Sequence, residues 1–189
     1  SGVTLPWMSI GYEVKLTPLQ MLALYNAVAN NGKKMKPMFV KGVSQHGQIL
    51  KQFEPEVLNS SICSVATLEK IRELLKGVVE RGTARNIRND TYDIAGKTGT
   101  AQVAKGSEGY RNEDGVEYMA SFAGYFPADD PMYSCIVAVN SPSNDVYYGN
   151  VVAGTVFREI ADRVYALSYD KIPAGRVRPD IEEGVLPWS

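Results

Sequence analysis

The residues best suited to chemistry lie in one short run, Gly96-Lys97-Thr98-Gly99-Thr100. The lysine supplies a positive charge, and the two threonine hydroxyls can hold a substrate carboxylate. Gly99 has no side chain, so a peptide-like substrate can lie against the backbone there. Neighbouring side chains point to opposite faces of a strand, which would separate Lys97 and Gly99 from Thr98 and Thr100. The run suits an active-site strand for acyl transfer, and the alternative for these residues alone is a solvated turn.

A phosphate-binding loop is a second chemistry that uses such residues. It requires the pattern G-x-x-x-x-G-K-[ST] between a strand and a helix. Gly96-Lys97-Thr98 matches the last three positions, but Thr91 stands where the first glycine should be. Residues 100–109 also contain two glycines and lack helical periodicity. The phosphate-binding reading therefore fails on both counts.

The few other candidates for chemistry do not combine into a site. His46 is the only histidine and lies in a turn-like segment, Ser44 to Gly47, so a Ser-His-Asp triad is not expected. Together with two distant cysteines, Cys63 and Cys135, it does not supply the three or four ligands of a zinc site. Cys135 begins the apolar run 135–139 and is interpreted as a buried thiol. We expect no disulfide framework, no metal and no organic cofactor.

Composition places the chain among ordinary globular domains. Its 189 residues fit about one domain, with 44% hydrophobic and 22% charged residues. A net charge of −1, from 20 basic and 21 acidic residues, makes nucleic acid a poor partner. No apolar run reaches the length of a membrane span, and no secretory signal is visible. The chain starts at Ser1 without an initiator methionine, so we expect a piece excised from a longer protein.

Periodicity and turn signals predict the elements that must position this run. Residues 1–16 carry no clear element beyond the alternating stretch 12–16. Helices are predicted from a capping Thr17 to about Ala29, from a capping Ser64 to Gly82, and from about Asn150 to Leu167. Strands are predicted in 37–53, as a pair joined by a turn at His46-Gly47, and at 92–103, 119–126 and 132–139. A Gly-rich insertion covers 105–117, and the predicted domain, 1–167, is followed by a linker or tail, 168–189.

Five sequence blocks span about residues 9–167. They are Leu16-Thr17-Pro18-Leu19-Gln20 with the helix ending Ala29-Asn30-Asn31-Gly32, Gly82-Thr83-Ala84, Ile94 to Gln102, Phe122 to Pro127, and Tyr147-Tyr148-Gly149. Together, and in this order, they resemble class B penicillin-binding proteins, most closely the septal, division-specific transpeptidases.

The resemblance implies covalent acyl transfer. In the family, the serine of a Ser-x-x-Lys motif attacks the D-Ala-D-Ala stem peptide of peptidoglycan or a β-lactam ring. A Ser-x-Asn motif assists proton transfer, and the Lys-Thr-Gly strand binds the substrate. By this resemblance Lys97 would act electrostatically near the Ser-x-Asn serine, and Thr98 and Thr100 would bind the substrate carboxylate along the Gly99 backbone. The backbone N–H of Thr100 would be one of two oxyanion-hole donors.

The chain departs from the family's pattern at its most important position. It contains no Ser-x-Asn, and its one Ser-x-x-Lys, Ser168 to Lys171, follows the last predicted helix, in the wrong order. We therefore predict one wall of an active site without its nucleophile, inactive by itself. A serine β-lactamase and a non-catalytic interaction module of the same fold remain alternatives.

The resemblance also implies a fold, a location and partners. The fold is α+β, the C-terminal portion of the penicillin-binding/serine β-lactamase type, with an antiparallel sheet flanked by helices. The parent would be a D,D-transpeptidase on the periplasmic face of the inner membrane, anchored by an N-terminal segment absent here, and would work with division or elongation proteins. The strand 132–139 would lack its outer neighbour, so we expect the isolated chain to self-associate there, unless residues 1–16 cover that edge.

Overall fold

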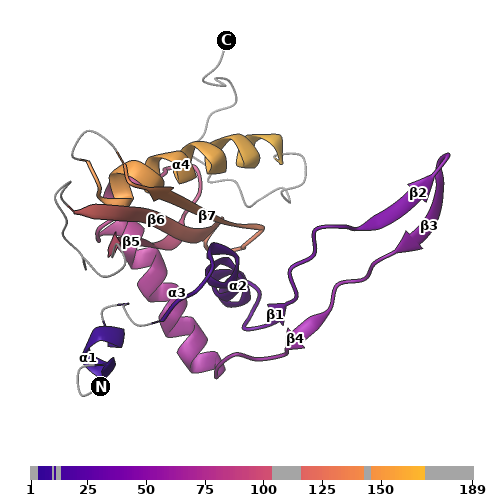
Figure 1. Ribbon diagram of the computed structural model, residues 1–189, viewed down its shortest axis with the longest axis horizontal. Coiled ribbons are helices and arrows are strands. Elements are labelled where there is room, and N and C mark those ends of the chain that lie inside the picture. Colours follow the sequence, from indigo (N-terminus) through magenta and orange to yellow (C-terminus); the bar gives the residue numbers. More distant parts are fainter. Residues whose placement is uncertain (1–3, 10, 12–13, 104–115, 143–145, 169–189) are drawn as a thin grey trace, which may run out of the picture.

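The structure is a computed structural model that describes residues 4–9, 11, 14–103, 116–142 and 146–168. Helices and strands are arranged around one sheet, with a long two-stranded projection at one side (Figure 1). The helices are α1 (Thr4–Ser9), α2 (Pro18–Ala29), α3 (Val65–Glu80), α4 (Gly149–Leu167) and a 3-10 turn, η1 (Arg85–Ile87). The strands are β1 (Lys34–Met35), β2 (Gly42–Gln45), β3 (Gln48–Gln52), β4 (Val57–Asn59), β5 (Ala95–Val103), β6 (Glu117–Phe126) and β7 (Tyr133–Asn140).

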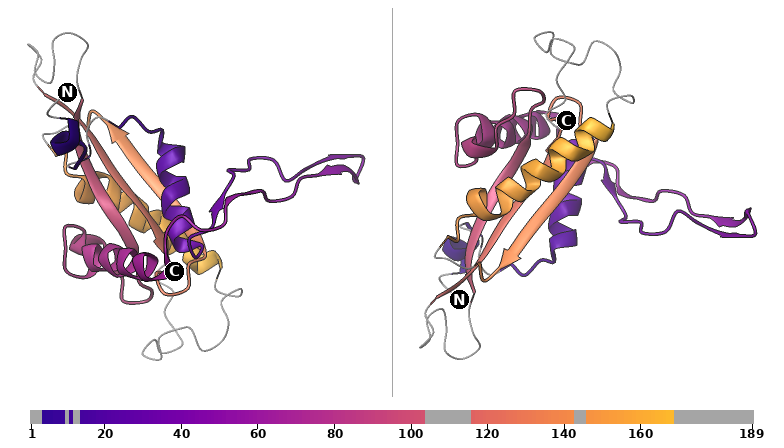
Figure 2. Two further views of the ribbon diagram at one scale, coloured as in Figure 1. Left: turned by 90° about the horizontal axis from the view of Figure 1, so that it is seen from below. Right: turned by 90° about the horizontal axis from the view of Figure 1, so that it is seen from above.

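The main sheet has three antiparallel strands in the order β5-β6-β7. The register places Thr98 opposite Phe122, and Phe122 opposite Val137. Helix α4 lies across one face of this sheet, and α2 and α3 lie on the other (Figure 2). The predicted α+β fold, an antiparallel sheet flanked by helices, is therefore confirmed.

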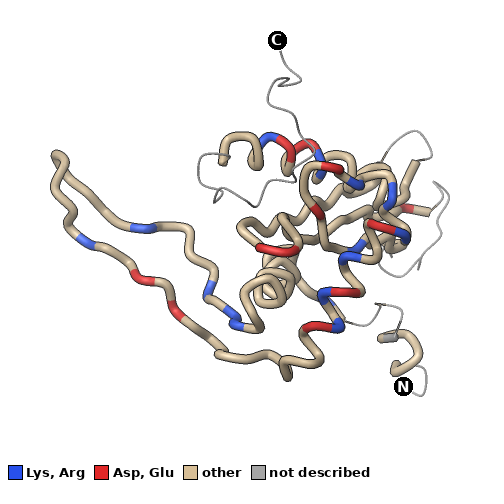
Figure 3. Tube along the Cα trace, turned by 180° about the vertical axis from the view of Figure 1, so that it is seen from behind, with Lys and Arg blue, Asp and Glu red and all other residues tan. Residues whose placement is uncertain are grey.

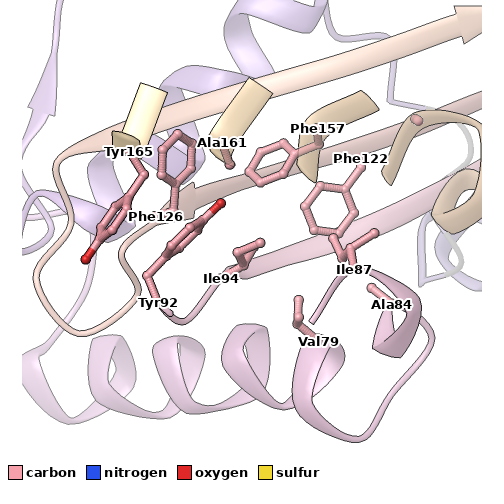
Figure 4. Close-up of a cluster of buried hydrophobic side chains, with 11 residues drawn as sticks. Val79, Ala84, Ile87, Tyr92, Ile94, Phe122, Phe126, Phe157, Ala161 and Tyr165 are labelled. Carbon is pink, nitrogen blue, oxygen red and sulfur yellow. The ribbon is translucent and has the colours of Figure 1, made fainter. Parts of the chain in front are cut away.

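Alternating side chains of β6 supply the two halves of the core. Phe122 and Phe126 are buried against α4, where Phe157 meets them with ring centroids 4.7 and 5.8 Å away (Figure 4). Tyr125, between them in sequence, is buried on the opposite face with Val28 of α2. The strand is apolar on both faces because both faces are covered by helices.

The helices begin where the sequence predicts. The Thr17 hydroxyl accepts the Gln20 N–H, and the Gln20 side chain accepts the Thr17 N–H, which forms a complete capping box. Ser64 caps α3 by accepting the Thr67 N–H. Arg72 of α3 then donates to the carbonyls of Val28 and Ala29, the last residues of α2, and so joins the two helices.

A two-stranded projection, here called the arm (residues 36–56), extends away from the sheet (Figures 1 and 2). It contains the hairpin of β2 and β3, whose side chains are all exposed. The predicted strand pair and its turn are confirmed: His46 and Gly47 both have positive φ, 50° and 80°, as a tight two-residue hairpin turn requires. Strands β1 and β4 pair at its base.

Several boundaries differ from the prediction. Helix α1 forms where no element is predicted, since six residues are too few to show helical periodicity. The strand predicted from residue 92 begins at Ala95, because Ala95 already pairs with Tyr125 and β6 ends at Phe126. Most of the predicted insertion at 105–117, and the tail from residue 169, lie outside the described residues.

Both outer strands of the sheet have an open edge among the described residues. Among the described residues, β5 and β7 each pair only with β6, so both are edge strands. No described part of residues 1–16 pairs with β7. Within the same described segments, no helix has the length and apolar character needed to cross a bilayer.

Candidate active site

Strand β5 carries the predicted site residues at an open edge of the sheet. Thr98 lies opposite Phe122, whose side chain packs on α4, so Thr98 and Thr100 belong to the α4 face. Lys97 and Gly99 belong to the other face. The alternation predicted from the sequence is therefore present.

The Lys97 ammonium nevertheless reaches the hydroxyl of its neighbour. Its Nζ lies 2.7 Å from the Thr98 carbonyl oxygen and 3.2 Å from Thr98 Oγ1. Thr98 Oγ1 is in turn 3.1 Å from the hydroxyl of Thr83, which follows α3. One ammonium and two hydroxyls thus form a contiguous, solvent-accessible polar cluster. Thr83 lies in Gly82-Thr83-Ala84, one of the five blocks of the resemblance, which gives it no role.

Thr100 is held by the beginning of α4. The N–H of Gly149 donates to Thr100 Oγ1 at 3.1 Å. Because a hydroxyl has one donor proton besides its acceptor lone pairs, this contact leaves the Thr100 O–H able to donate elsewhere. A threonine positioned in this way suits donation to a carboxylate, the role that the resemblance gives it.

Close backbone packing at this point depends on Gly149. A Cβ atom there would lie 2.5 Å from the Gly99 carbonyl oxygen and 2.6 Å from that of Ser121. Gly99 itself faces Ser121, since an added Cβ would be 2.5 Å from the serine Oγ. The first residue of α4 therefore sits directly on β5 and β6, and Gly99 leaves room for a neighbouring side chain.

Three tyrosines form a stack beside Thr100. Tyr118 lies opposite Gln102, on the same sheet face as Thr100. Tyr147 stacks on Tyr118 at 4.0 Å between centroids and 9° between planes, and Tyr148 contacts Tyr147 at 4.8 Å. A hydrogen bond with Tyr148 raises the pKa of Tyr147. The stack provides an aromatic surface next to β5. In the sequence, only the consecutive tyrosines Tyr147-Tyr148 indicate that such a stack could form.

A partly buried hydrogen-bond network joins α4 to the segment that precedes β5. Asp162 Oδ1 accepts from the Tyr92 hydroxyl at 2.7 Å and from Asn89 Nδ2 at 2.6 Å. Arg158 Nε donates to both Asp162 oxygens, at 3.0 and 2.9 Å, and Arg158 also donates to the Ile87 carbonyl. Burial raises the pKa of Tyr92, and the hydrogen bond to Asp162 adds to the rise. Three partners of one carboxylate, through four hydrogen bonds, thus hold the segment before β5 in place.

Lys76 of α3 likewise joins its helix to the segment before β5. Lys76 Nζ lies 2.8 Å from Asp93 Oδ2 and 2.9 Å from Asp129 Oδ1. Burial lowers the pKa of Lys76, but the hydrogen bonds and charges of the two aspartates outweigh this and raise it. Helix α3 is thereby tied both to the residues before β5 and to the turn between β6 and β7.

The remaining candidates lie apart from the strand. His46 is in the turn at the tip of the arm. Cys63 and Cys135 are half-buried free thiols, and burial raises the pKa of Cys135, consistent with an inert packing role. Ser168 is buried at the end of α4, where its hydroxyl contacts Tyr133 and the Val164 carbonyl, a structural role. In the part of the chain that is described, no group of residues could hold a metal ion.

Comparison with known proteins agrees with this arrangement. The sequence model described as "Penicillin binding protein transpeptidase domain" matches residues 4–162. The chain belongs to this family. Penicillin-binding protein PbpB of Mycolicibacterium smegmatis is 33% identical over 171 residues, which cover 85% of this chain and 26% of that protein. The peptidoglycan D,D-transpeptidase FtsI homolog of Mesostigma viride is 28% identical over 177 residues, 87% of this chain and 29% of that one.

Solved structures extend the similarity to three dimensions. Penicillin-binding protein 3 of Mycobacterium tuberculosis, in complex with ampicillin, matches with a TM-score of 0.77 and 30% identity. The match covers 95% of this chain and 40% of that one. The class B resemblance read from the five sequence blocks is confirmed, and this transpeptidase-family chain spans well under half the length of the relatives it matches.

Proposed function

We propose that this chain is the C-terminal part of the transpeptidase domain of a serine-type peptidoglycan D,D-transpeptidase, and that it supplies the substrate-binding strand. The observation that carries this is the pair of contacts on the open edge strand β5. Lys97 lies beside the Thr98 hydroxyl, and Gly149 orients the Thr100 hydroxyl. An edge strand with exposed backbone and ordered hydroxyls suits an extended peptide substrate, which can add to it as a further strand.

Each residue then has a physical role. The hydroxyls of Thr98 and Thr100 donate to the carboxylate of a D-Ala-D-Ala stem peptide or of a β-lactam, with Gly99 lying between them on the strand. Lys97 places a positive charge next to that carboxylate and to the proton-transfer residues. The backbone N–H of Thr100 stabilises the developing oxyanion, and one such donor is worth roughly 3 kcal/mol. The attacking serine, its lysine and the Ser-x-Asn motif come from a part of the protein outside this chain.

Thr83 adds a second hydroxyl to the polar cluster of Lys97 and Thr98. Its hydroxyl is within hydrogen-bond distance of Thr98 Oγ1, which also accepts from Lys97. If Thr98 accepts from both, its own proton is available for a substrate carboxylate. The polar cluster of Lys97, Thr98 and Thr83 therefore suits anion binding better than a single threonine would.

The family resemblance implies a cellular setting, which we also propose. We propose that the longer protein lies on the periplasmic face of the inner membrane, where it acts on peptidoglycan stem peptides, binds β-lactams and works with division or elongation proteins. The ampicillin complex of the Mycobacterium tuberculosis relative supports the proposed β-lactam binding. The domain would end near residue 167, with 168–189 as linker or tail.

The test is the acylation rate of the longer protein by a fluorescent penicillin. A charge-assisted hydrogen bond is worth about 1.5–3 kcal/mol, so Thr100→Val should slow acylation at least about tenfold. Thr155→Val is the matched control, because its hydroxyl donates to the Val151 carbonyl on the exposed side of α4. Acylation that is unchanged in Thr100→Val would contradict the assignment. Rapid release of the penicilloyl group would instead indicate a β-lactamase.

A further inference from the structure

Two segments outside β5 hold the hydroxyls of the proposed site. The Thr83 hydroxyl, in the turn that follows α3, lies 3.1 Å from Thr98 Oγ1. The N–H of Gly149, at the beginning of α4, donates to Thr100 Oγ1 at 3.1 Å. The directions of the two site hydroxyls therefore depend on how the turn after α3 and the start of α4 lie relative to each other.

Asn86 and Asn150, here called the amide pair, join these two segments directly. Asn86 Nδ2 donates to the Asn150 carbonyl oxygen at 2.8 Å, and Asn150 Nδ2 donates to Asn86 Oδ1 at 3.1 Å. Asn86 thus uses both the donor and the acceptor of its side-chain amide. Asn150 is the sequence neighbour of Gly149, and Asn86 follows Thr83 within the same turn. The amide pair closes a ring of contacts through Thr98, Thr83, Asn86, Asn150, Gly149 and Thr100.

One half of this ring is anchored in the core. Ile87 of η1 and Ala84 before it are fully buried in the core that α4 covers (Figure 4). The Ala84 N–H donates to the Val78 carbonyl in the last turn of α3 at 3.0 Å, and the Ile87 N–H donates to the Ala84 carbonyl at 3.1 Å. Thr83 and Asn86 therefore lie on a turn that packing and backbone hydrogen bonds fix in place.

The other half, the first turn of α4, has fewer anchors. Its N-cap residue, Tyr148, makes no side-chain capping hydrogen bond, and helix ends that lack a cap fray. Residues 149–157 carry no charged side chain, and the charged residues of α4 appear only from Arg158 onward (Figure 3). The network of Arg158 and Asp162 therefore holds the later turns of the helix. The amide pair supplies the polar contact that ties the first turn to the anchored half of the ring.

We propose that Asn86 and Asn150 are positioning residues for the substrate carboxylate. They hold the first turn of α4 where the Gly149 N–H orients the Thr100 hydroxyl, and neither of them contacts the substrate. The inference rests on the proposed function of β5, because it acts through the threonines described there. A hydroxyl that is ordered in advance needs no reorganisation when the carboxylate arrives. Loss of the amide pair therefore weakens carboxylate binding although every binding group is still present.

The test compares two compounds in the longer protein, a penicillin with its free carboxylate and the methyl ester of the same penicillin. Asn86→Ala removes both hydrogen bonds of the amide pair. It should slow acylation by the free penicillin at least about fivefold and acylation by the ester less than about twofold. Asn150→Ala removes only one of the two bonds and should fall between the parent and Asn86→Ala.

Asn30→Ala is the matched control, because it removes an exposed amide that donates to the Lys33 carbonyl at the end of α2, on the other face of the sheet. Both of its acylation rates should equal those of the parent. Equal slowing of both compounds in Asn86→Ala would indicate a general loss of structure and overturns the positioning role. Unchanged acylation by the free penicillin overturns it too.

Thr100→Val separates failure of this inference from failure of the proposed function. If β5 receives the carboxylate, Thr100→Val also slows the free penicillin selectively. Adding Asn86→Ala to it should then have little further effect, because both changes act on the same hydroxyl. Selective slowing by Thr100→Val together with full additivity in the double variant refutes the positioning role alone. A Thr100→Val variant without selectivity refutes the proposed function and this inference with it.

A further measurement needs neither a nucleophile nor a ligand. In the 189-residue chain, hydrogen exchange of the Gly149 amide should be at least about fivefold faster in Asn86→Ala than in the parent. Exchange of the Phe157 amide, in the middle of α4, should be the same in both. Equal exchange at Gly149, or a matching acceleration at Phe157, contradicts the proposal that the amide pair holds the first turn.

Discussion

Gly149→Ala should weaken both the fold and the proposed site, because the first turn of α4 touches the site strand there. The added methyl group would lie 2.5 Å from the Gly99 carbonyl oxygen and 2.6 Å from the Ser121 carbonyl oxygen. Both atoms belong to the backbone of the sheet, so neither can move aside as a flexible side chain would. Helix α4 must therefore withdraw from β5.

The cost can be estimated from two contributions. Overpacking against rigid neighbours costs about 1–3 kcal/mol. Withdrawal of the helix also lengthens the Gly149 N–H to Thr100 Oγ1 hydrogen bond, worth about 0.5–1.5 kcal/mol. A total near 3 kcal/mol corresponds to a fall in Tm of roughly 6–12 °C for a chain of this size. In the longer protein the same change should slow penicillin acylation, since Thr100 loses the contact that orients its hydroxyl.

Thermal unfolding followed by circular dichroism measures the loss. Gly77→Ala, in the last turn of α3, is the matched control, because the nearest atoms that its Cβ would meet belong to the flexible side chain of Arg81, at 3.2 Å. Replacing an interior helical glycine by alanine gains up to about 1 kcal/mol, so this variant should be as stable as the parent or more stable. Equal Tm values for Gly149→Ala and the parent chain would refute the packing argument, and unchanged acylation would refute its link to Thr100.

Three further outcomes are expected. The 189-residue chain should form no penicilloyl adduct with a fluorescent penicillin, and an adduct in good yield on any serine in intact-mass spectrometry would contradict the missing nucleophile. Because the pKa of Tyr92 is raised in the fold, its contribution to the free energy of unfolding is fully present below the unfolded value of 10.0. That contribution is lost as the pH rises above 10.0. The unfolding free energy of the parent should thus fall by up to about 1.4 kcal/mol per pH unit more than that of Tyr92→Phe, and parallel pH profiles would contradict the role of the Asp162 network. The chain should self-associate through the open edge of β7 at micromolar concentration, whereas a clean monomer in sedimentation equilibrium with slow amide exchange across 133–140 would exclude this.

Local signals in the sequence were sufficient for the long elements of the fold. The Thr17 and Gln20 capping box begins α2 as predicted, and Ser64 begins α3. The turn signal at 127–131 separates β6 from β7 as expected. These patterns succeed because capping and turn formation depend on residues only a few positions apart. The short elements α1, β1 and β4 were missed because two to six residues carry no measurable period.

The candidate site also depends on long-range contacts, which local sequence patterns do not predict. The alternation of Lys97 with Thr98 follows from strand geometry alone and was predicted. The Thr83–Thr98 contact and the Gly149–Thr100 contact join residues 15 and 49 positions apart. No spacing rule predicts such pairs, because they arise only when α3 and α4 pack on the sheet. The resemblance marked both segments as family blocks, but it gave no role to Thr83 or Gly149.

The central claim is that β5 receives the substrate carboxylate, and a crystal structure of the longer protein acylated by a penicillin tests it most directly. The account predicts that the β-lactam carboxylate lies within about 2.5–3.0 Å of the Thr98 or Thr100 hydroxyl, with the acylated serine outside residues 1–189. A carboxylate bound away from β5, or acylation of a serine within this chain, would contradict it.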